Sequence, residues 1–225
     1  TFISYDDSKS IALKAEYIRE QKLGGAMIWE LSQDSKGTLL DSLYEGLYED
    51  SALAAKDFQG HWAEAVLQKW LDMGYITGYP DGTFKPEEFI TRAEFVKLIN
   101  DLFGFTETAK IFFDDVNKDS WYYEEVQKAY KTGDIIGVSE TQFSPDDNIT
   151  REQAAIIISR LLDMKGNDKG ADGFYDSSKI SSWAKEYVGA VAEYNLIKGY
   201  EDNTFKPQNN IKRAEAVVLL DRILE

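Results

Sequence analysis

The chain has 225 residues, with 25 Lys and Arg against 40 Asp and Glu, which gives a formal net charge of -15 at pH 7. This acidic balance argues against nucleic acid or an anionic membrane surface as the main partner, because both require a basic footprint. The absence of cysteine excludes a disulfide framework and a thiolate metal site, and the sequence has no run of about 18 apolar residues that would predict a membrane-spanning helix.

The first 47 residues predict one helix, one strand and a second helix. Apolar residues at helical spacing predict a helix over Ser10–Lys22, which ends at a glycine pair. The nearly all-apolar Ala26–Leu31 predicts a short buried strand of the kind found in parallel sheets. Four leucines then predict an amphipathic helix that reaches residue 47. Because Thr1 stands in mid-pattern, we expect the chain to be the C-terminal piece of a longer protein.

A pattern of Asp, Trp, Gly, Phe, Pro and Arg occurs three times after residue 56. Its register is set by Arg92, Arg151 and Arg213, and in every copy a tryptophan precedes the arginine by 30 residues. A repeat of this kind defines the architecture, so it outweighs local signals. Each copy predicts a helix that begins at the tryptophan, a loop, and a second helix that begins at the arginine. The predicted first helices are Trp62–Met73, Trp121–Thr132 and Trp183–Tyr194.

The loop between the two helices is expected to turn through a residue with positive φ. Gly82 supplies this residue in the first copy, after Pro80, and Asn203 does so in the third, because glycine and asparagine tolerate the conformation. The second copy has Thr141 there, so we expect its loop to differ. The residues expected to end the first helices in a similar way are Gly74, Gly133 and Asn195.

The second helices begin with a capping signal. Thr91 and Glu94 have the spacing of a capping box, which is worth about 1 kcal/mol. Thr150 and Gln153 repeat this box in the second copy. In the third copy Lys212 replaces the threonine, so the side-chain cap should be missing there.

An arginine in the first turn of a helix is unfavourable by roughly 0.3–1 kcal/mol, because the positive end of the helix dipole repels it. Arg92, Arg151 and Arg213 all stand at this position. Beside free backbone N–H groups, a guanidinium would form an anion site that grips a carboxylate or phosphate through two hydrogen bonds. An ion pair with Glu94 or a nearby aspartate is the alternative, and these residues alone leave both open.

The first segment carries YDD-S-x-S-I, then GGAMIWELSQD and GTLL. In this order the motifs resemble the end of a family 18 glycoside hydrolase, the chitinase-type TIM barrel. The resemblance implies that Ala26–Leu31 is the eighth barrel strand and that Trp29 forms the floor of the sugar-binding site. The alternative is that Trp29 is an aromatic residue of the hydrophobic core. The family's Asp-x-x-Asp-x-Asp-x-Glu motif does not occur in this sequence. We therefore expect no catalytic residue and no hydrolysis by this chain alone.

The three copies share Asp…Trp-Ala…Gly-Tyr-x-Asp-Gly-Thr-Phe-x-Pro…Ile-Thr-Arg-Ala-Glu, most completely in the first. Over residues 55 to 225 this pattern resembles S-layer homology (SLH) domains. The resemblance implies a mainly α fold, with three helix-loop-helix repeats in a pseudo-threefold bundle. It also implies grooves that bind secondary cell wall polymer, a pyruvylated polysaccharide linked to peptidoglycan. The expected location is extracellular, at the cell surface, S-layer or cell wall.

By position, the resemblance implies three kinds of side chain in each polymer site. Arginines would pair with the pyruvate carboxylate, tryptophans would pack on the sugar, and aspartates would accept hydrogen bonds from its hydroxyls. The arginines are Arg92, Arg151 and Arg213. The tryptophans, for which a core position is the alternative, are Trp62, Trp121 and Trp183. The aspartates are Asp57, Asp115 and Asp176. Gly82 would let the backbone approach the ligand.

The grooves are not expected to be equivalent. The first copy keeps Pro80 and Gly82 in its turn and the Thr91–Glu94 box in its helix, so we expect Arg92 to matter most for binding. The second copy has VSET in place of YPDG, the third has Lys212 in place of threonine, and Ala55 stands where the family has phenylalanine.

No cofactor and no metal site are expected. Asp115-x-Asn117-x-Asp119 begins like a calcium-binding EF-hand loop, but Ser120 stands where glycine is needed and Val126 where the bidentate glutamate should be. His61, the single histidine, has no second histidine with which to share a metal, so we expect it to start a helix.

We interpret the sequence as a non-catalytic surface anchor that tethers a secreted glycosidase. The predicted boundaries are 1–47 for the barrel remnant, 48–56 for a linker, and 57–104, 112–164 and 174–225 for the repeats, with Lys165–Gly173 as a flexible connection. One alternative is hydrolysis of chitin or a related glycan by the full-length parent. Another is a tetratricopeptide-like protein scaffold, whose period is near 34 residues, whereas the arginines here are 59 and 62 residues apart.

Overall fold

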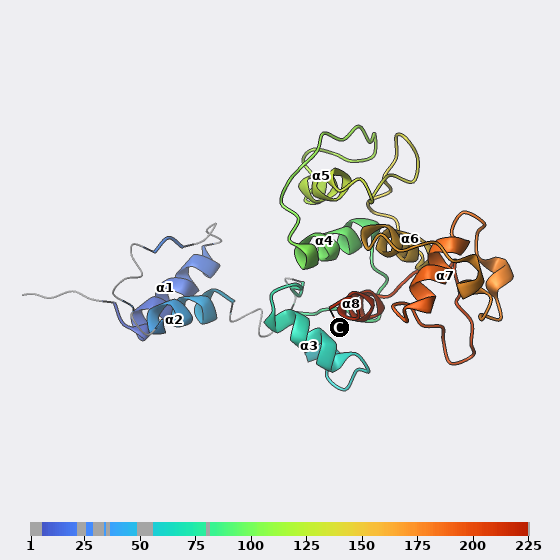
Figure 1. Cartoon of the computed structure of the whole chain (residues 1–225). Coiled ribbons are helices and arrows are strands. Elements are labelled where there is room, and N and C mark those ends of the chain that lie inside the picture. The colour runs from blue at the N-terminus through green and yellow to red at the C-terminus, as the bar shows by residue number, and fades with distance from the viewer. Residues whose placement is uncertain are drawn as a thin grey trace, which may run out of the picture. The chain divides into compact units, whose positions relative to one another are not determined.

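The computed structural model describes residues 6–21, 26–28, 34, 37–48, 56–79 and 82–224. Within these ranges the chain forms eight α-helices and no strand (Figure 1), which confirms the mainly α fold class. The chain divides into two compact units, Thr1–Gln59 with Thr77–Phe84 and Gly60–Ile76 with Lys85–Glu225. No helix in the described part of the chain is long and apolar enough to cross a lipid bilayer.

The first unit contains a pair of packed helices, α1 (Ser8–Glu20) and α2 (Thr38–Tyr48). A capping box starts α1, because Asp7 Oδ1 accepts from the Ser10 amide at 2.7 Å and Ser10 Oγ accepts from the Asp7 amide at 2.9 Å. Small residues allow the helices to approach closely, since a Cβ added to Gly46 would lie 2.6 Å from the Cβ of Ala15, which is fully buried. Both helices predicted for this segment are confirmed.

The strand predicted for Ala26–Leu31 is wrong for the residues that the structure describes. Residues 26–28 have no regular structure and are exposed, Met27 to 90%. Trp29 and the rest of the predicted strand lie outside the described residues. A strand of a parallel sheet is buried by neighbouring strands and helices, and the described residues supply no other strand to pair with this one.

The second unit holds two helices from each repeat. The first helices are α3 (Glu64–Asp72), α5 (Tyr123–Lys131) and α7 (Lys185–Glu193). The second helices are α4 (Arg92–Phe103), α6 (Arg151–Leu161) and α8 (Arg213–Asp221). Each second helix begins at its arginine, as predicted. Each first helix begins two residues after its tryptophan, which lies in the turn before the helix.

The ends of these helices confirm most of the predicted local chemistry. At α4, Thr91 Oγ1 accepts from the Glu94 amide at 3.2 Å, and Glu94 Oε2 accepts from the Thr91 amide at 2.9 Å; an equivalent box starts α6. At α8, Glu215 accepts from the Lys212 amide at 3.0 Å, but an ammonium group has no lone pair with which to accept in return. The residues of positive φ that follow the first helices are Gly74, Gly133 and Asn195.

The loops between the helices also turn as the sequence indicates. Gly82 and Asn203 have φ values of 76° and 57°, and each donates its amide to the tyrosine carbonyl three residues earlier, at 2.9 and 2.8 Å. In the second copy the Thr141 amide donates instead to Ser139 Oγ at 3.4 Å. The second loop is therefore built differently, as predicted.

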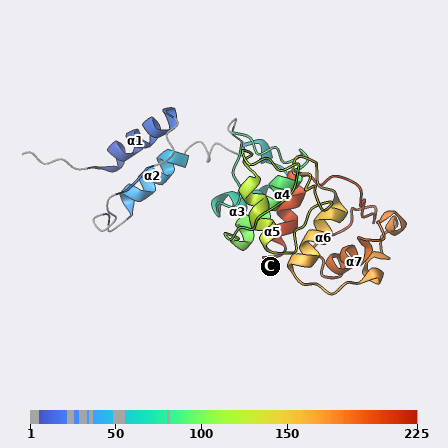
Figure 2. The same ribbon diagram turned by 90° about the horizontal axis from the view of Figure 1, so that it is seen from above.

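The helices of the second unit pack across repeats. α4 contacts α5, α6 contacts α7, and α8 contacts α3 (Figures 1 and 2). The third repeat therefore closes on the first, and the three repeats form a ring. In a linear solenoid each repeat contacts only its neighbours along the chain, so the contact of α8 with α3 excludes that arrangement and supports the pseudo-threefold bundle.

A ring of backbone hydrogen bonds joins the repeats just before their second helices. Ile90 donates to the carbonyl of Ile211 at 3.1 Å, Ile211 to that of Ile149 at 3.0 Å, and Ile149 to that of Ile90 at 3.1 Å. All three isoleucine side chains are buried. Each repeat is thus hydrogen-bonded to both of the others at an equivalent residue.

A buried carboxylate stabilises the contact between α8 and α3, which closes the ring. Asp221, at the end of α8, accepts from Trp70 Nε1 at 2.8 Å and from Lys69 Nζ at 2.7 Å, both on α3. At the same position of α4, Asn100 donates to a backbone carbonyl of α5 at 2.9 Å. At that position of α6, Ser159 Oγ is buried and has no hydrogen-bond partner among the described residues. The three helix contacts are equivalent in place but differ in chemistry.

The prediction of a flexible connection at Lys165–Gly173 is wrong. A short 3-10 helix, η3 (Asp168–Ala171), packs against α7, and Ala171 is fully buried. The approach is close because α7 carries Gly189, where an added Cβ would lie 1.7 Å from the carbonyl oxygen of Asn167. The glycines and polar residues of this segment suggested a flexible loop. The segment is ordered because Gly189 on α7 leaves room for it to pack.

Gly189→Ala should lower the free energy of unfolding by about 1–3 kcal/mol or more, the usual effect of overpacking. This is opposite to the gain of up to about 1 kcal/mol that alanine gives over glycine inside a helix. Urea denaturation would measure the difference. Gly173→Ala is the matched control, because a Cβ there meets nothing within 4 Å. Equal stabilities of the two variants would contradict the close packing of η3 on α7.

Candidate functional site

The backbone at the start of the second helices is not open to a ligand. The amides of Arg92, Arg151 and Arg213 donate to carbonyl oxygens of another repeat at 2.9, 2.9 and 2.8 Å. The second amide of each helix donates to a proline carbonyl of the same neighbouring repeat. In α4 and α6 the third amide donates to the hydroxyl of the capping threonine. The prolines are Pro145, Pro207 and Pro86. The expectation of free N–H groups beside the arginines is wrong, so an anion here must be bound by side chains.

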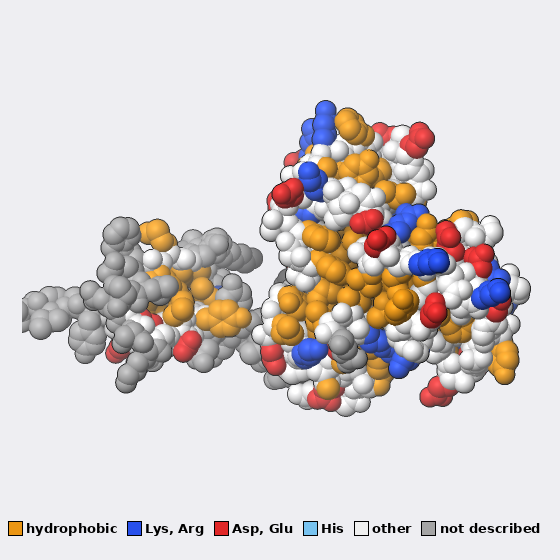
Figure 3. Space-filling view, in the orientation of Figure 1, with side chains coloured by type: hydrophobic (Ala, Val, Ile, Leu, Met, Phe, Trp, Pro, Cys, Tyr) orange, Lys and Arg blue, Asp and Glu red, His pale blue; other side chains and the backbone are white. Residues whose placement is uncertain are grey.

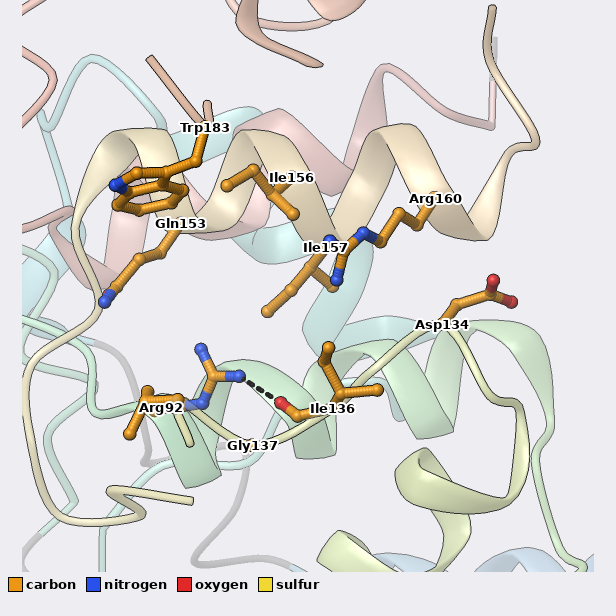
Figure 4. A pocket seen from close by; sticks show the side chains of 10 residues that line it. Arg92, Asp134, Ile136, Gly137, Gln153, Ile156, Ile157, Arg160 and Trp183 are labelled. Carbon is orange, nitrogen blue, oxygen red and sulfur yellow. Dashed lines mark hydrogen bonds between the residues drawn. The ribbon is translucent and has the colours of Figure 1, made fainter. Parts of the chain in front are cut away.

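Arg92 lies in a cavity of about 290 Å³ that all three repeats build (Figure 4). The arginine comes from the first repeat, the backbone of Ile136–Val138 and one face of α6 come from the second, and Trp183 comes from the third. The other lining residues are Asp134, Gln153, Ile156, Ile157 and Arg160. This volume is near the lower end of the range for small-molecule sites, so the cavity can hold one small polar group beside the indole.

The Arg92 guanidinium is buried and forms no ion pair with any residue that the structure describes. Only 6% of the residue is exposed; Nη2 donates to the carbonyl of Ile136 at 2.7 Å, and the guanidinium carbon lies 4.9 Å from the ring centre of Phe143. Nε has no hydrogen-bond partner in the described part of the chain. Burial, and then the nearby charge of Arg160, lower the pKa of Arg92 to about 10. A buried cation held in this way is typical of a binding site.

Arg151 lies in a second, smaller cavity of about 150 Å³, which Trp62 of the first repeat lines. Its Nε and Nη2 donate to two backbone carbonyl oxygens at 2.8 and 2.9 Å, and the guanidinium carbon lies 4.5 Å from the ring centre of Tyr200. Glu215 Oε1 is 3.9 Å from Nη1. The guanidinium of Arg151 is therefore more fully satisfied by the protein than that of Arg92.

Arg213 is held by an ion pair. Its Nη1 donates to Glu94 Oε1 at 2.8 Å, and the two side chains are only 12% and 22% exposed. The ion-pair alternative that the sequence left open is thus correct for Arg213. The three arginines have equivalent positions but different electrostatic surroundings.

The three tryptophans are exposed, so the core position considered for them is wrong. Trp62, Trp121 and Trp183 are 63%, 57% and 56% exposed. Trp183 borders the Arg92 cavity and Trp62 the Arg151 cavity. On the face shown in Figure 3, hydrophobic side chains gather over α4, α6 and α8, with basic side chains among them. Apolar faces next to guanidinium groups are what a sugar with an acidic substituent would require.

The three aspartates support the loops. Asp57, Asp115 and Asp176 accept from the amide of the loop phenylalanine at 2.9, 2.9 and 2.7 Å. Asp115 and Asp176 also accept from the following amide, at 2.7 and 2.8 Å, where the backbone has positive φ. These bonds hold the loop conformation, and a contact of the aspartates or of Gly82 with a ligand stays a prediction.

Sequence reasoning missed two side chains of the Arg92 cavity, Gln153 and Arg160. Gln153 was recognised only as part of a helix cap, and Arg160 carried no motif. A signal was present in the aligned copies, since the equivalents of Gln153 are Glu94 and Glu215, and those of Arg160 are Asp101 and Arg222. Charge differences between otherwise matching copies mark the places where the grooves diverge.

Residues 56–96, 112–155 and 173–217 match the family described as S-layer homology domain. The chain belongs to this family. Residues 1–34 match glycosyl hydrolases family 18, so both resemblances noted in the sequence are confirmed. The SLH repeats account for most of the second unit.

Among similar proteins, an exoglucanase, XynX, of Acetivibrio thermocellus is 32% identical over 202 residues, which cover 88% of this chain and 18% of that protein. A surface-layer 125 kDa protein of Lysinibacillus sphaericus is 31% identical over 180 residues, 78% of this chain and 15% of that protein. A cellulosome-anchoring protein of Acetivibrio thermocellus is 35% identical over 158 residues, 67% of this chain and 35% of that protein. The chain thus spans about a third or less of these relatives. Family and relatives point to the cell surface or cell wall as its location.

Arg92→Met should leave the free energy of unfolding unchanged or raise it by about 1–2 kcal/mol, because it removes a buried cation that has no carboxylate partner. Arg213→Met should lower it by about 1–3 kcal/mol, because Glu94 loses its cation while it is largely buried. Urea denaturation of both variants at pH 7 compares them directly. A larger loss for Arg92→Met than for Arg213→Met would show that Arg92 serves mainly to hold the fold.

Proposed function

We propose that the SLH repeats anchor this chain non-covalently to a bacterial cell wall by binding pyruvylated secondary cell wall polymer. The observation that carries the proposal is the Arg92 cavity, in which a buried guanidinium forms no ion pair with any described residue and lies near an exposed indole. The coarser function, anchoring at the cell surface, follows from the family and its relatives.

The chemistry of the cavity favours an acidic sugar over a neutral one. A carboxylate would provide the counter-ion that the described residues do not give Arg92, and a planar guanidinium binds it through two parallel hydrogen bonds. The face of Trp183 would cover the C–H groups of the ring. A neutral sugar would cover the indole equally well but would leave the buried charge uncompensated. Because the whole chain carries a net charge of -15, affinity for an anion depends on these few local cations.

The anchored partner in the same polypeptide is proposed to be a family 18 glycosidase that acts on chitin or a related glycan. This proposal rests on the match of residues 1–34 to that family, and the similarity to a protein named as an exoglucanase agrees with an enzyme joined to SLH repeats. The catalytic acid motif does not occur in this sequence, so hydrolysis would belong to the parent.

Binding to purified cell wall sacculi tests the anchoring function. The wild-type chain should sediment with intact sacculi and lose binding when the polymer is stripped by acid. Arg92→Ala should weaken binding about tenfold or more, and Arg92→Lys should also bind poorly because a point charge cannot reproduce the two-pronged contact. Lys118→Ala, which removes an exposed cation, is the control for net charge. Equal binding to intact and stripped sacculi would refute the proposal.

A further inference from the structure

We infer that the third residue of each second helix determines how strongly the arginine site beside it binds a carboxylate. The Arg92 site binds a carboxylate most strongly, and the Arg213 site is closed by a carboxylate of the chain. The inference rests on the proposed function and deepens it, because it assigns Gln153, Glu94 and Glu215 as specificity-determining residues. It also assigns Arg160 as a second cation of the strongest site.

The capping interaction orients these side chains. In α4, Glu94 Oε2 accepts from the Thr91 amide at 2.9 Å, and Oε1 is left to accept from Arg213. In α8, Glu215 Oε2 accepts from the helix-start amide at 3.0 Å, and Oε1 lies on the side of Arg151. One oxygen is held by the helix start, so the other faces the arginine of the preceding repeat in the ring.

Gln153 breaks this pattern at the Arg92 site. Its Oε1 accepts from the Thr150 amide at 3.0 Å, so the other terminal atom is the amide nitrogen, which can only donate. Gln153 lines the Arg92 cavity from α6 (Figure 4). At the Arg92 site the amide nitrogen of Gln153, a hydrogen-bond donor, therefore stands where the other two arginines have a carboxylate oxygen. A ligand with acceptor oxygens would satisfy both Gln153 and Arg92.

Arg160 adds a second positive charge to the same cavity. Arg92 and Arg160 enter it from opposite walls in Figure 4, and within the described residues Arg160 forms no ion pair but lies 5.1 Å from the ring centre of Tyr187. Asp134 is the carboxylate of the lining, and it points away from Arg92 in Figure 4. The equivalent of Arg160 in α4 is Asp101, which pairs with Lys97 at 2.6 Å. The Arg213 site therefore has an acid where the Arg92 site has a base.

Glu94 acts as an internal competitor for Arg213. Because its side chain is held by both the helix start and the guanidinium, a ligand carboxylate must displace a group that is tethered beside the arginine and has a high effective concentration. At Arg151 the competing carboxylate is farther away, at 3.9 Å. At Arg92 the described residues supply no such carboxylate. The expected order of affinity is Arg92, then Arg151, then Arg213.

The test uses the full chain and calorimetry with a 4,6-pyruvate ketal of a methyl hexoside, with the uncharged methyl ester of that ketal as a second ligand. Gln153→Glu should weaken binding of the ketal about tenfold, because it places a carboxylate beside Arg92. Arg160→Met should also weaken it. In an Arg92→Ala background, Glu94→Gln should restore part of the binding lost with Arg92, because it removes the carboxylate that pairs with Arg213. Glutamine keeps the helix cap, as Gln153 does in α6, and glutamate keeps it, as Glu94 does in α4, so both exchanges preserve the start of the helix.

The controls separate this inference from the proposed function. Glu107→Gln removes one negative charge at an 81% exposed side chain and should leave affinity unchanged. Perturbation of the Trp183 indole N–H resonance should require about tenfold more ketal in Gln153→Glu. If the wild type does not bind the ketal, the proposed function fails. If the wild type binds and Gln153→Glu binds equally well, or if Glu94→Gln restores no affinity for the ketal, the proposed function stands. The inference that the third helix residue sets the affinity of each site is then refuted.

Discussion

The hydrogen-bond ring of Ile90, Ile149 and Ile211 determines where the three arginine side chains lie. Each isoleucine stands two residues before an arginine, so the ring places the start of each second helix against another repeat. The arginine amides are used in that contact, and the guanidinium groups of Arg92 and Arg151 donate to loop carbonyls of a neighbouring repeat. The Arg92 and Arg151 cavities exist only because three repeats meet at this point.

Arg92 and Arg151 make a structural contact with a neighbouring loop while they line a cavity. Arg92 and Arg151 each give Nη2 to a loop carbonyl, at 2.7 and 2.9 Å, and this fixes the plane of the guanidinium. The partial negative charge of the carbonyl offsets part of the repulsion by the helix dipole. A group that is already oriented loses little entropy when a ligand binds. The same contact therefore explains how a cation is tolerated at a helix start and why it is ready for an anion.

The sequence predicts the features that depend on neighbouring residues. Threonine and glutamate three residues apart predict the start of α4, and Gly82 predicts its turn, because capping and backbone sterics act over a few residues. It does not reveal that α4 packs on α5, since an apolar helix face does not specify its partner. For the same reason it does not reveal that Arg92 lies beside residues 136–138 of the second copy, which line the Arg92 cavity.

The contact of Asp221 with Trp70 gives the three repeats a property that an open array lacks. Because α8 packs on α3, the position at which the polypeptide enters and leaves the ring is not dictated by the packing. A circular permutation that joins the end of α8 to Gly60 and opens the chain between the first and second repeats would keep every helix contact. A fourth repeat could not be added without breaking the contact of Asp221 with Trp70, so the ring is complete with three repeats.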